Sequence, residues 1–131
     1  MIHLDTSFLI RAMAAGTPED RKLRTWLREG TALGVSSVAW AEFLCGPIDA
    51  REINLASRIV ADPEPFLASD ALAAARMFNF GGRRRGSLLD CMIASVALRV
   101  DAMLATANPA DFRRLEPAGL RLVHAAPGAA E

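Results

Sequence analysis

Met1-Ile2-His3-Leu4-Asp5-Thr6-Ser7 is the stretch that decides the fold of this 131-residue chain. Residues 2–4 form an apolar run that predicts a short buried strand, and residues 6–15 follow with a helical pattern. Asp5 stands between the two. In open α/β sheets, ligands bind beyond the carboxyl ends of the strands. Asp5 is therefore expected at the ligand-binding edge of a sheet.

Short apolar runs alternate with helical patterns along the rest of the chain. Further strands are predicted at residues 33–36, 102–105 and 120–123, and further helices at residues 18–28, 38–45, 48–60, 69–80 and 87–100. Strands separated by helices predict a parallel sheet that is covered on both faces. The expected α/β fold is a three-layer α/β/α sandwich with a short, mainly parallel central sheet. It forms one domain over residues 1–125, and residues 126–131 are expected to be a flexible C-terminal tail.

Composition argues against several classes of protein. Lys+Arg 15 and Asp+Glu 15 give a net charge of zero, so no overall positive charge points to nucleic acid. The apolar segment 88–98 contains an acid and is too short to cross a bilayer, so no membrane association is expected. Cys45 and Cys91 lack Cys-x-x-Cys spacing. We expect reduced, packed thiols in a cytoplasmic protein.

Two further acids lie in predicted apolar helices. Glu42 is the single charge within residues 38–44, where a buried carboxylate is costly unless it is paired or bound to metal. Asp90 lies in the first turn of the longest apolar helix. Carboxylates that converge at one edge of a sheet repel one another unless a cation neutralises them, and a divalent metal commonly does so.

Each of these acids also has a simpler explanation. Asp5 could serve only as the N-cap of the helix that follows it. Glu42 could face solvent or pair with an arginine. Asp90 could form a capping box with Ser87, because an acid in the first helical turn is favoured by the helix dipole.

A fourth polar group follows the strand predicted at residues 102–105. Thr106 ends that strand, and Asn108 and Asp111 come shortly after it. Asn108 could be only a turn residue and Asp111 only a helix cap. In the alternative interpretation, this segment adds a fourth polar position to the group of acids expected at the sheet edge.

Taken together, four segments of this chain resemble the PIN-domain family. They are Met1-Ile2-His3-Leu4-Asp5-Thr6-Ser7, Ala39-Trp40-Ala41-Glu42-Phe43, Asp90-Cys91-Met92-Ile93-Ala94 and Leu104-Ala105-Thr106-Ala107-Asn108-Pro109-Ala110-Asp111-Phe112. Within the family, the likeness is to VapC toxins of bacterial type II toxin–antitoxin modules. The resemblance implies an endoribonuclease that depends on Mg²⁺ (or Mn²⁺). It also implies a cognate VapB-type antitoxin and a homodimer within a toxin–antitoxin complex.

By motif, the resemblance implies that Asp5, Glu42 and Asp90 hold the metal. Asp5 and Asp90 are expected to bind the ion directly, and Glu42 through water or by orienting the attacking water. Many relatives carry a fourth acid where this chain has Asn108, and the nearby Asp111 could replace it, so Asp111 joins the expected catalytic set. The residues expected to support these ligands are Thr6, Ser7, Thr106 and Asn108.

Basic residues near Asp90 suggest where RNA could bind. Arg83, Arg84 and Arg85 directly precede the Asp90 helix and are flanked by glycines. Arginine suits phosphate contacts, which position a nucleic acid without reading its sequence. The alternative is a solvated loop. Arg113 and Arg114 are weaker candidates for the same role.

Apolar residues of the first two helices offer a surface for a partner. Phe8, Leu9, Met13, Trp26 and Leu27 exceed what one small sheet face obviously needs. In members of the resembled family, such a surface docks an antitoxin peptide. The alternative is that these side chains are ordinary core.

Other functions fit the sequence less well. A catalytically impaired PIN scaffold that acts by partner or RNA binding is the main alternative, because Asn108 is neutral. A receiver-like module would need a late lysine, and Lys22 is the only lysine. Ser7 disfavours an Asp-x-Asp phosphatase. A histidine-pair ribonuclease is disfavoured because His3 is expected in the core, and His124 is expected to be structural or exposed.

Overall fold

Four short parallel strands form the centre of the molecule, in the order β2-β1-β3-β4. The computed structural model describes residues 1–123, so the expected tail at 126–131 and His124 lie outside the described residues. The strands are β1 (Ile2–Leu4), β2 (Leu33–Gly34), β3 (Met103–Ala105) and β4 (Leu122–Val123). Because all four are parallel, their carboxyl ends meet at one edge of the sheet.

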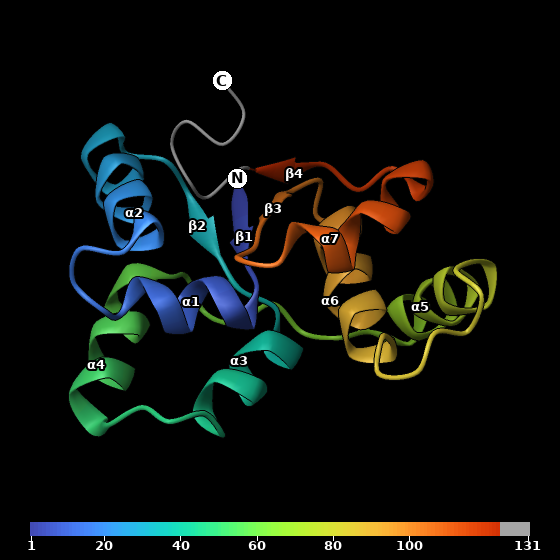
Figure 1. The fold of residues 1–131 in the computed structure, drawn as a ribbon, viewed down its shortest axis with the longest axis horizontal. Coiled ribbons are helices and arrows are strands. Elements are labelled where there is room, and N and C mark those ends of the chain that lie inside the picture. The colour runs from blue at the N-terminus through green and yellow to red at the C-terminus, as the bar shows by residue number, and fades with distance from the viewer. Residues whose placement is uncertain (124–131) are drawn as a thin grey trace.

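Helices cover both sides of this sheet. They are α1 (Thr6–Ala12), α2 (Pro18–Glu29), α3 (Ser37–Leu44), α4 (Ala50–Ile59), α5 (Ala68–Phe80), α6 (Leu88–Arg99) and α7 (Pro109–Phe112), followed by the 3₁₀ helix η1 (Arg113–Ala118). Figure 1 shows α1 and α2 to one side of the strands and α5 and α6 to the other. The predicted three-layer α/β/α sandwich is therefore confirmed, with a sheet that is wholly parallel among the described residues.

Capping side chains move several helix boundaries away from their predicted positions. The helix predicted from residue 38 begins at Ser37, because the Ser36 side chain accepts a hydrogen bond from the Ala39 amide at 3.0 Å. The helix predicted over 48–60 begins at Ala50, after a capping box between Asp49 and Glu52. These caps satisfy amides that have no partner within the first helical turn.

The proposed partner surface on the first two helices is mostly core. Phe8 and Leu9 are fully buried, Trp26 is buried, and Met13 packs partly buried against them. The Phe8 and Trp26 rings stack with their centroids 5.5 Å apart. Only Leu27 is exposed, at 45 %. The prediction of a free docking surface on these five residues is therefore wrong, because the α1 and α2 side chains pack inward.

A buried carboxylate fastens the connector before α5 to the end of α6. Asp70 is 2 % exposed and accepts hydrogen bonds from Arg99 Nε at 3.0 and 3.1 Å and from the Leu67 amide at 2.8 Å. Arg99 also donates to the Pro65 carbonyl at 2.8 Å and lies 3.6 Å from the Glu64 carboxylate. This network fixes the end of α6 against the start of α5.

The histidine and cysteine predictions are tested by burial. His3 is a core residue of β1, as predicted, and a Cβ on Gly34 would lie 3.0 Å from its ring. Cys91 is buried, also as predicted, but Cys45 is exposed because it follows the end of α3. Both cysteines are free thiols. Within residues 1–123, every helix is too short or too polar to span a bilayer.

Candidate functional site

Asp5 sits at the carboxyl end of β1, beside the end of β3. Its backbone amide donates to the Ala105 carbonyl at 3.0 Å, which continues the ladder between the two strands. The carboxylate is 4 % exposed. Its Oδ1 accepts from the Phe8 amide at 2.9 Å and from Ser7 Oγ at 2.8 Å, and its Oδ2 accepts from Thr106 Oγ1 at 2.7 Å. Asp5 is thus an N-cap, as the simpler explanation had it, but it is also bound to groups that a cap does not need.

Ser7 and Thr106 link the two loops that leave β1 and β3. Their hydroxyl oxygens lie 3.3 Å apart. Ser7 Oγ also accepts from the Ala107 amide at 3.1 Å, and Thr106 Oγ1 accepts from the Asn108 amide at 3.0 Å. These bonds hold the Asp5 carboxylate in one orientation, because each of its oxygens has a fixed donor.

Glu42 is tied to the same edge through Thr6. Thr6 Oγ1 donates to Glu42 Oε1 at 2.7 Å and approaches the Ala39 carbonyl at 3.4 Å. Thr6 was expected to support the Asp5 carboxylate, but its hydroxyl donates to Glu42 instead. The side-chain donors to Asp5 are Ser7 and Thr106. Glu42 is half-buried and forms no ion pair with an arginine among residues 1–123.

Asp90 lies in a small pocket of about 100 Å³, here called the Asp90 pocket. Its lining residues are Arg84, Arg85, Gly86, Ser87, Asp90, Asp111 and Arg114. The capping box suggested for Ser87 does not form: Ser87 Oγ donates to the Arg84 carbonyl at 2.6 Å, and the helix has no side-chain cap. The position of Asp90 is therefore not explained by helix capping.

The carboxylates act on one another electrostatically. Burial, together with the negative charges of Asp111, Asp5 and Glu42, raises the pKa of Asp90 to about 6, while Arg114 opposes the shift. Burial also raises the pKa of Asp5, against the hydrogen bonds from Phe8, Thr106 and Ser7. The four acids, which come from the regions of α1, α3, α6 and α7, thus lie close enough to repel one another. A positive charge among them would reduce this repulsion.

The carboxylates do not form a ready-made coordination shell. In the part of the chain that the structure describes, no group of three or more His, Cys, Asp or Glu side chains is arranged to hold a metal ion. The chemistry of the donors nevertheless fits a hard divalent cation, since all four are carboxylates and since burial and their mutual repulsion raise the pKa of Asp90.

A protein-family model for the PIN domain matches residues 2–116 of this chain. The chain belongs to the PIN domain family. A search of curated proteins found no match. The matched segment contains all four acids of the site and the strands that position them.

Solved structures share the fold of this PIN domain at low sequence identity. The chain is 24 % identical to a chain of VapBC-1 from nontypeable Haemophilus influenzae, with a TM-score of 0.73, covering 95 % of this chain and 98 % of that one. It is 18 % identical to a chain of VapBC2 from Rickettsia felis bound to a promoter DNA fragment, with a TM-score of 0.72 and coverages of 95 % and 98 %. It is 17 % identical to a chain of DNA-bound VapBC from Salmonella typhimurium, with a TM-score of 0.70 and coverages of 95 % of this chain and 97 % of that one.

Of the two polar residues after β3, Asp111 and not Asn108 lines the Asp90 pocket. Asn108 is exposed, and its side chain makes no capping hydrogen bond to α7. Asp111 is half-buried, lines the Asp90 pocket and raises the pKa of Asp90. One helical turn separates the two positions, which lets the acid reach the site from α7.

The basic loop divides into two parts. Arg83, which has a positive φ of 56°, bonds Asn79 and lies 5.4 Å over the Phe78 ring, so it is engaged with α5. Arg84 and Arg85 are exposed and line the Asp90 pocket. Arg114, a weaker candidate from sequence, lines the same pocket, and its buried Nη2 has no hydrogen-bond partner among residues 1–123.

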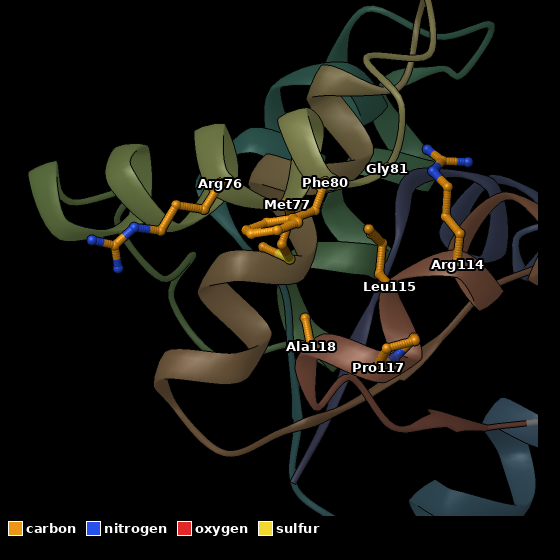
Figure 2. Close-up of a pocket in the computed structure, with 8 residues that line it drawn as sticks. All are labelled: Arg76, Met77, Phe80, Gly81, Arg114, Leu115, Pro117 and Ala118. Atoms are coloured by element: carbon orange, nitrogen blue, oxygen red, sulfur yellow. The ribbon is translucent and has the colours of Figure 1, made fainter.

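A larger hollow beside the Asp90 pocket has no counterpart in the sequence motifs. This hollow, here called the Phe80 pocket, has a volume of about 500 Å³. Figure 2 shows its lining residues, which are Arg76, Met77, Phe80, Gly81, Arg114, Leu115, Pro117 and Ala118. The only signal in the sequence is Phe80, an aromatic residue at the end of a predicted helix and next to two glycines.

Proposed function

We propose that this PIN domain is a metal-dependent endoribonuclease and the toxin component of a type II toxin–antitoxin system. The observation that carries the proposal is that Asp90 and Asp111, from two different helices, line one pocket together with Arg84 and Arg85. Burial and the charges of Asp111, Asp5 and Glu42 raise the pKa of Asp90 there. Carboxylates with strongly perturbed pKa values in a pocket are typical of functional sites. The PIN family match over residues 2–116 supports the reaction class.

The metal would be Mg²⁺ or Mn²⁺, with Asp5 and Asp90 as direct ligands. Glu42 would bind through water or orient a water, and Asp111 would supply the fourth carboxylate. When bound, such an ion offsets charge on the scissile phosphate and lowers the pKa of a water ligand. Ser7 and Thr106 hold Asp5, and Thr6 holds Glu42, so that these carboxylates do not reorient freely.

Arg84 and Arg85 are proposed to bind RNA phosphates. Both line the pocket that contains Asp90 and Asp111, and a phosphate drawn there by the arginines would lie beside the catalytic carboxylates. Arg83 contributes less, because it is already bonded to Asn79 and stacked on Phe78.

The biological partners are proposed from the relatives. The Haemophilus influenzae, Rickettsia felis and Salmonella typhimurium structures are all of VapBC complexes, two of them bound to DNA. We propose that this chain likewise binds a VapB-type antitoxin and forms a homodimer within the complex. The core residues of α1 and α2 do not provide the docking face, because all but Leu27 pack inward.

A catalytically impaired scaffold remains the second candidate, because Asn108 is neutral where relatives carry an acid. In that case the chain would bind RNA or a partner without cleaving. The position of Asp111 in the Asp90 pocket favours the active enzyme.

Incubation of the purified chain with total RNA tests the proposal. We expect cleavage with Mg²⁺ or Mn²⁺, no cleavage with EDTA, and a loss of at least about 100-fold in Asp5→Asn and Asp90→Asn. Asp62→Asn, an exposed aspartate outside the site, is the matched control and should cleave normally. Cleavage that persists in EDTA or in both variants would exclude the metal mechanism, and RNA binding without cleavage would favour the scaffold.

A further inference from the structure

We propose that the Phe80 pocket receives one unstacked base of the RNA substrate, next to the phosphate bound in the Asp90 pocket. The inference rests on the proposed ribonuclease function. Phe80 is the last residue of α5 and its side chain is 90 % exposed. The ring is therefore free of the core and available to a ligand that enters the hollow.

One side chain lines both pockets. Arg114 lines both, with the carboxylates Asp90 and Asp111 in one pocket and Phe80 in the other. Its side chain passes close to Gly81, where a Cβ would lie 3.5 Å from Arg114 Nε. A nucleotide whose phosphate contacts Arg114 from the Asp90 pocket would therefore have its base, or the next base along the strand, beside Phe80.

The chemistry of the Phe80 pocket suits a nucleobase. Figure 2 shows Phe80 and Met77 on the α5 side of the hollow and Leu115 and Pro117 on the η1 side. Single-stranded RNA is commonly recognised by stacking its splayed bases on aromatic side chains. The apolar walls would cover the faces of the base.

The positive charge of the residues that line the Phe80 pocket favours RNA over an apolar or basic protein segment. Arg76 and Arg114 belong to the lining, and none of the eight lining residues is acidic. Figure 2 shows the Arg76 side chain leading away from the hollow at the end opposite Arg114. A polyanion can contact an arginine at both ends of the hollow, whereas a basic peptide would be repelled.

Binding of short RNAs to Phe80 variants tests the proposal. Fluorescence anisotropy would measure the Kd of 5′-fluorescein-labelled single-stranded 12-mers of oligo(A), oligo(U) and oligo(C), in EDTA to prevent cleavage. Phe80→Ala is expected to raise the Kd of the preferred 12-mer by about 5- to 150-fold, as loss of one stacked base does. Phe80→Trp should stay within about 3-fold of wild type, since indole also stacks. Leu72→Ala, an exposed apolar residue of the same helix outside the pocket, is the matched control and should not change the Kd.

Kinetics separate stacking from a structural role. With Mg²⁺, Phe80→Ala should raise KM for the 12-mer and leave kcat and the melting temperature unchanged, because Phe80 is exposed. The proposed base pocket would be overturned if wild type binds the 12-mer and Phe80→Ala binds it with the same Kd. It would also be overturned if Phe80→Ala and Leu72→Ala lose affinity equally. A change of Phe80→Ala from dimer to monomer in light scattering would also overturn it, in favour of a protein partner.

The outcome distinguishes this inference from the proposed function. If wild type cleaves RNA, Asp90→Asn does not, and Phe80→Ala behaves as wild type, only the base pocket is wrong. If wild type neither binds nor cleaves any of the three 12-mers or total RNA, both are wrong.

Discussion

Replacement of Asp90 by asparagine should stabilise the metal-free protein, although Asp90 is proposed to be essential for activity. The folded pKa of about 6, against an ordinary value of 3.8, means that the fold favours the protonated carboxyl. Ionisation of Asp90 above pH 6 therefore lowers the free energy of unfolding. At ~1.4 kcal/mol for each unit, the cost approaches about 3 kcal/mol.

Two effects reduce the gain expected from Asp90→Asn. An acid in the first turn of α6 interacts favourably with the helix dipole, by about 0.5 kcal/mol. Asp90 is also only half-buried, and solvent screens part of its repulsion from Asp111, Asp5 and Glu42. We therefore expect a net stabilisation of about 1–2 kcal/mol at pH 8.

The pH dependence gives the sign of the effect. Because the folded pKa is raised, the favourable contribution of Asp90 is complete below about pH 4, where the carboxyl is protonated in both states, and is lost as the pH rises through about 6. The difference between Asp90→Asn and wild type should thus be largest at pH 8 and close to zero at pH 4.

Urea unfolding in EDTA at pH 4, 6 and 8 measures this difference. Asp62→Asn is the control for loss of one exposed negative charge and should change the free energy of unfolding by less than about 0.5 kcal/mol. If Asp90→Asn is less stable than wild type at pH 8, or if its effect is the same at pH 4 and pH 8, then the acids do not repel one another as argued.

Other predictions follow from particular contacts. Thr106→Val removes the 2.7 Å hydrogen bond to Asp5 and should lower the cleavage rate about tenfold and the free energy of unfolding by about 1–2 kcal/mol. Unchanged cleavage would show that this bond does not position the carboxylate. Asp70→Ala should destabilise the protein by about 2–4 kcal/mol in urea unfolding, because Arg99 loses both bonds to a buried carboxylate, and a loss below about 1 kcal/mol would speak against the network. Combined Arg84→Gln and Arg85→Gln should weaken RNA binding and reduce its log–log salt slope by about 0.7 for each lost phosphate contact, measured by anisotropy; an unchanged slope would make this a solvated loop.

The fold, and the placement of the acids near one another, could be predicted because they depend on local pattern. Asp5 directly follows a strand and precedes a helix, and this local order alone places the acid at the sheet edge. Asp90 followed from the same logic, since the most apolar helix must be central and its start must face the edge. Asn108 and Asp111 could be named but not ranked, because only the path of α7 shows which of them reaches Asp90.

The contacts within the site depend on strand register and helix packing, which no local pattern encodes. Thr106 is 101 residues from Asp5 and meets it because Leu4 pairs with Ala105. Thr6 bonds Glu42 because α1 packs on α3, which the sequence alone does not place. The Phe80 pocket depends likewise on how η1 lies against the end of α5.

Metal binding tests the central claim most directly, that acids distant in sequence form one cation site. Isothermal titration calorimetry of Mn²⁺ into the purified chain, at pH 7.5, should show binding to wild type and to Asp62→Asn. Asp5→Asn and Asp90→Asn should each lose at least about tenfold in affinity, while combined Arg84→Gln and Arg85→Gln should retain it. Wild-type affinity for Mn²⁺ in both Asp5→Asn and Asp90→Asn would contradict the account.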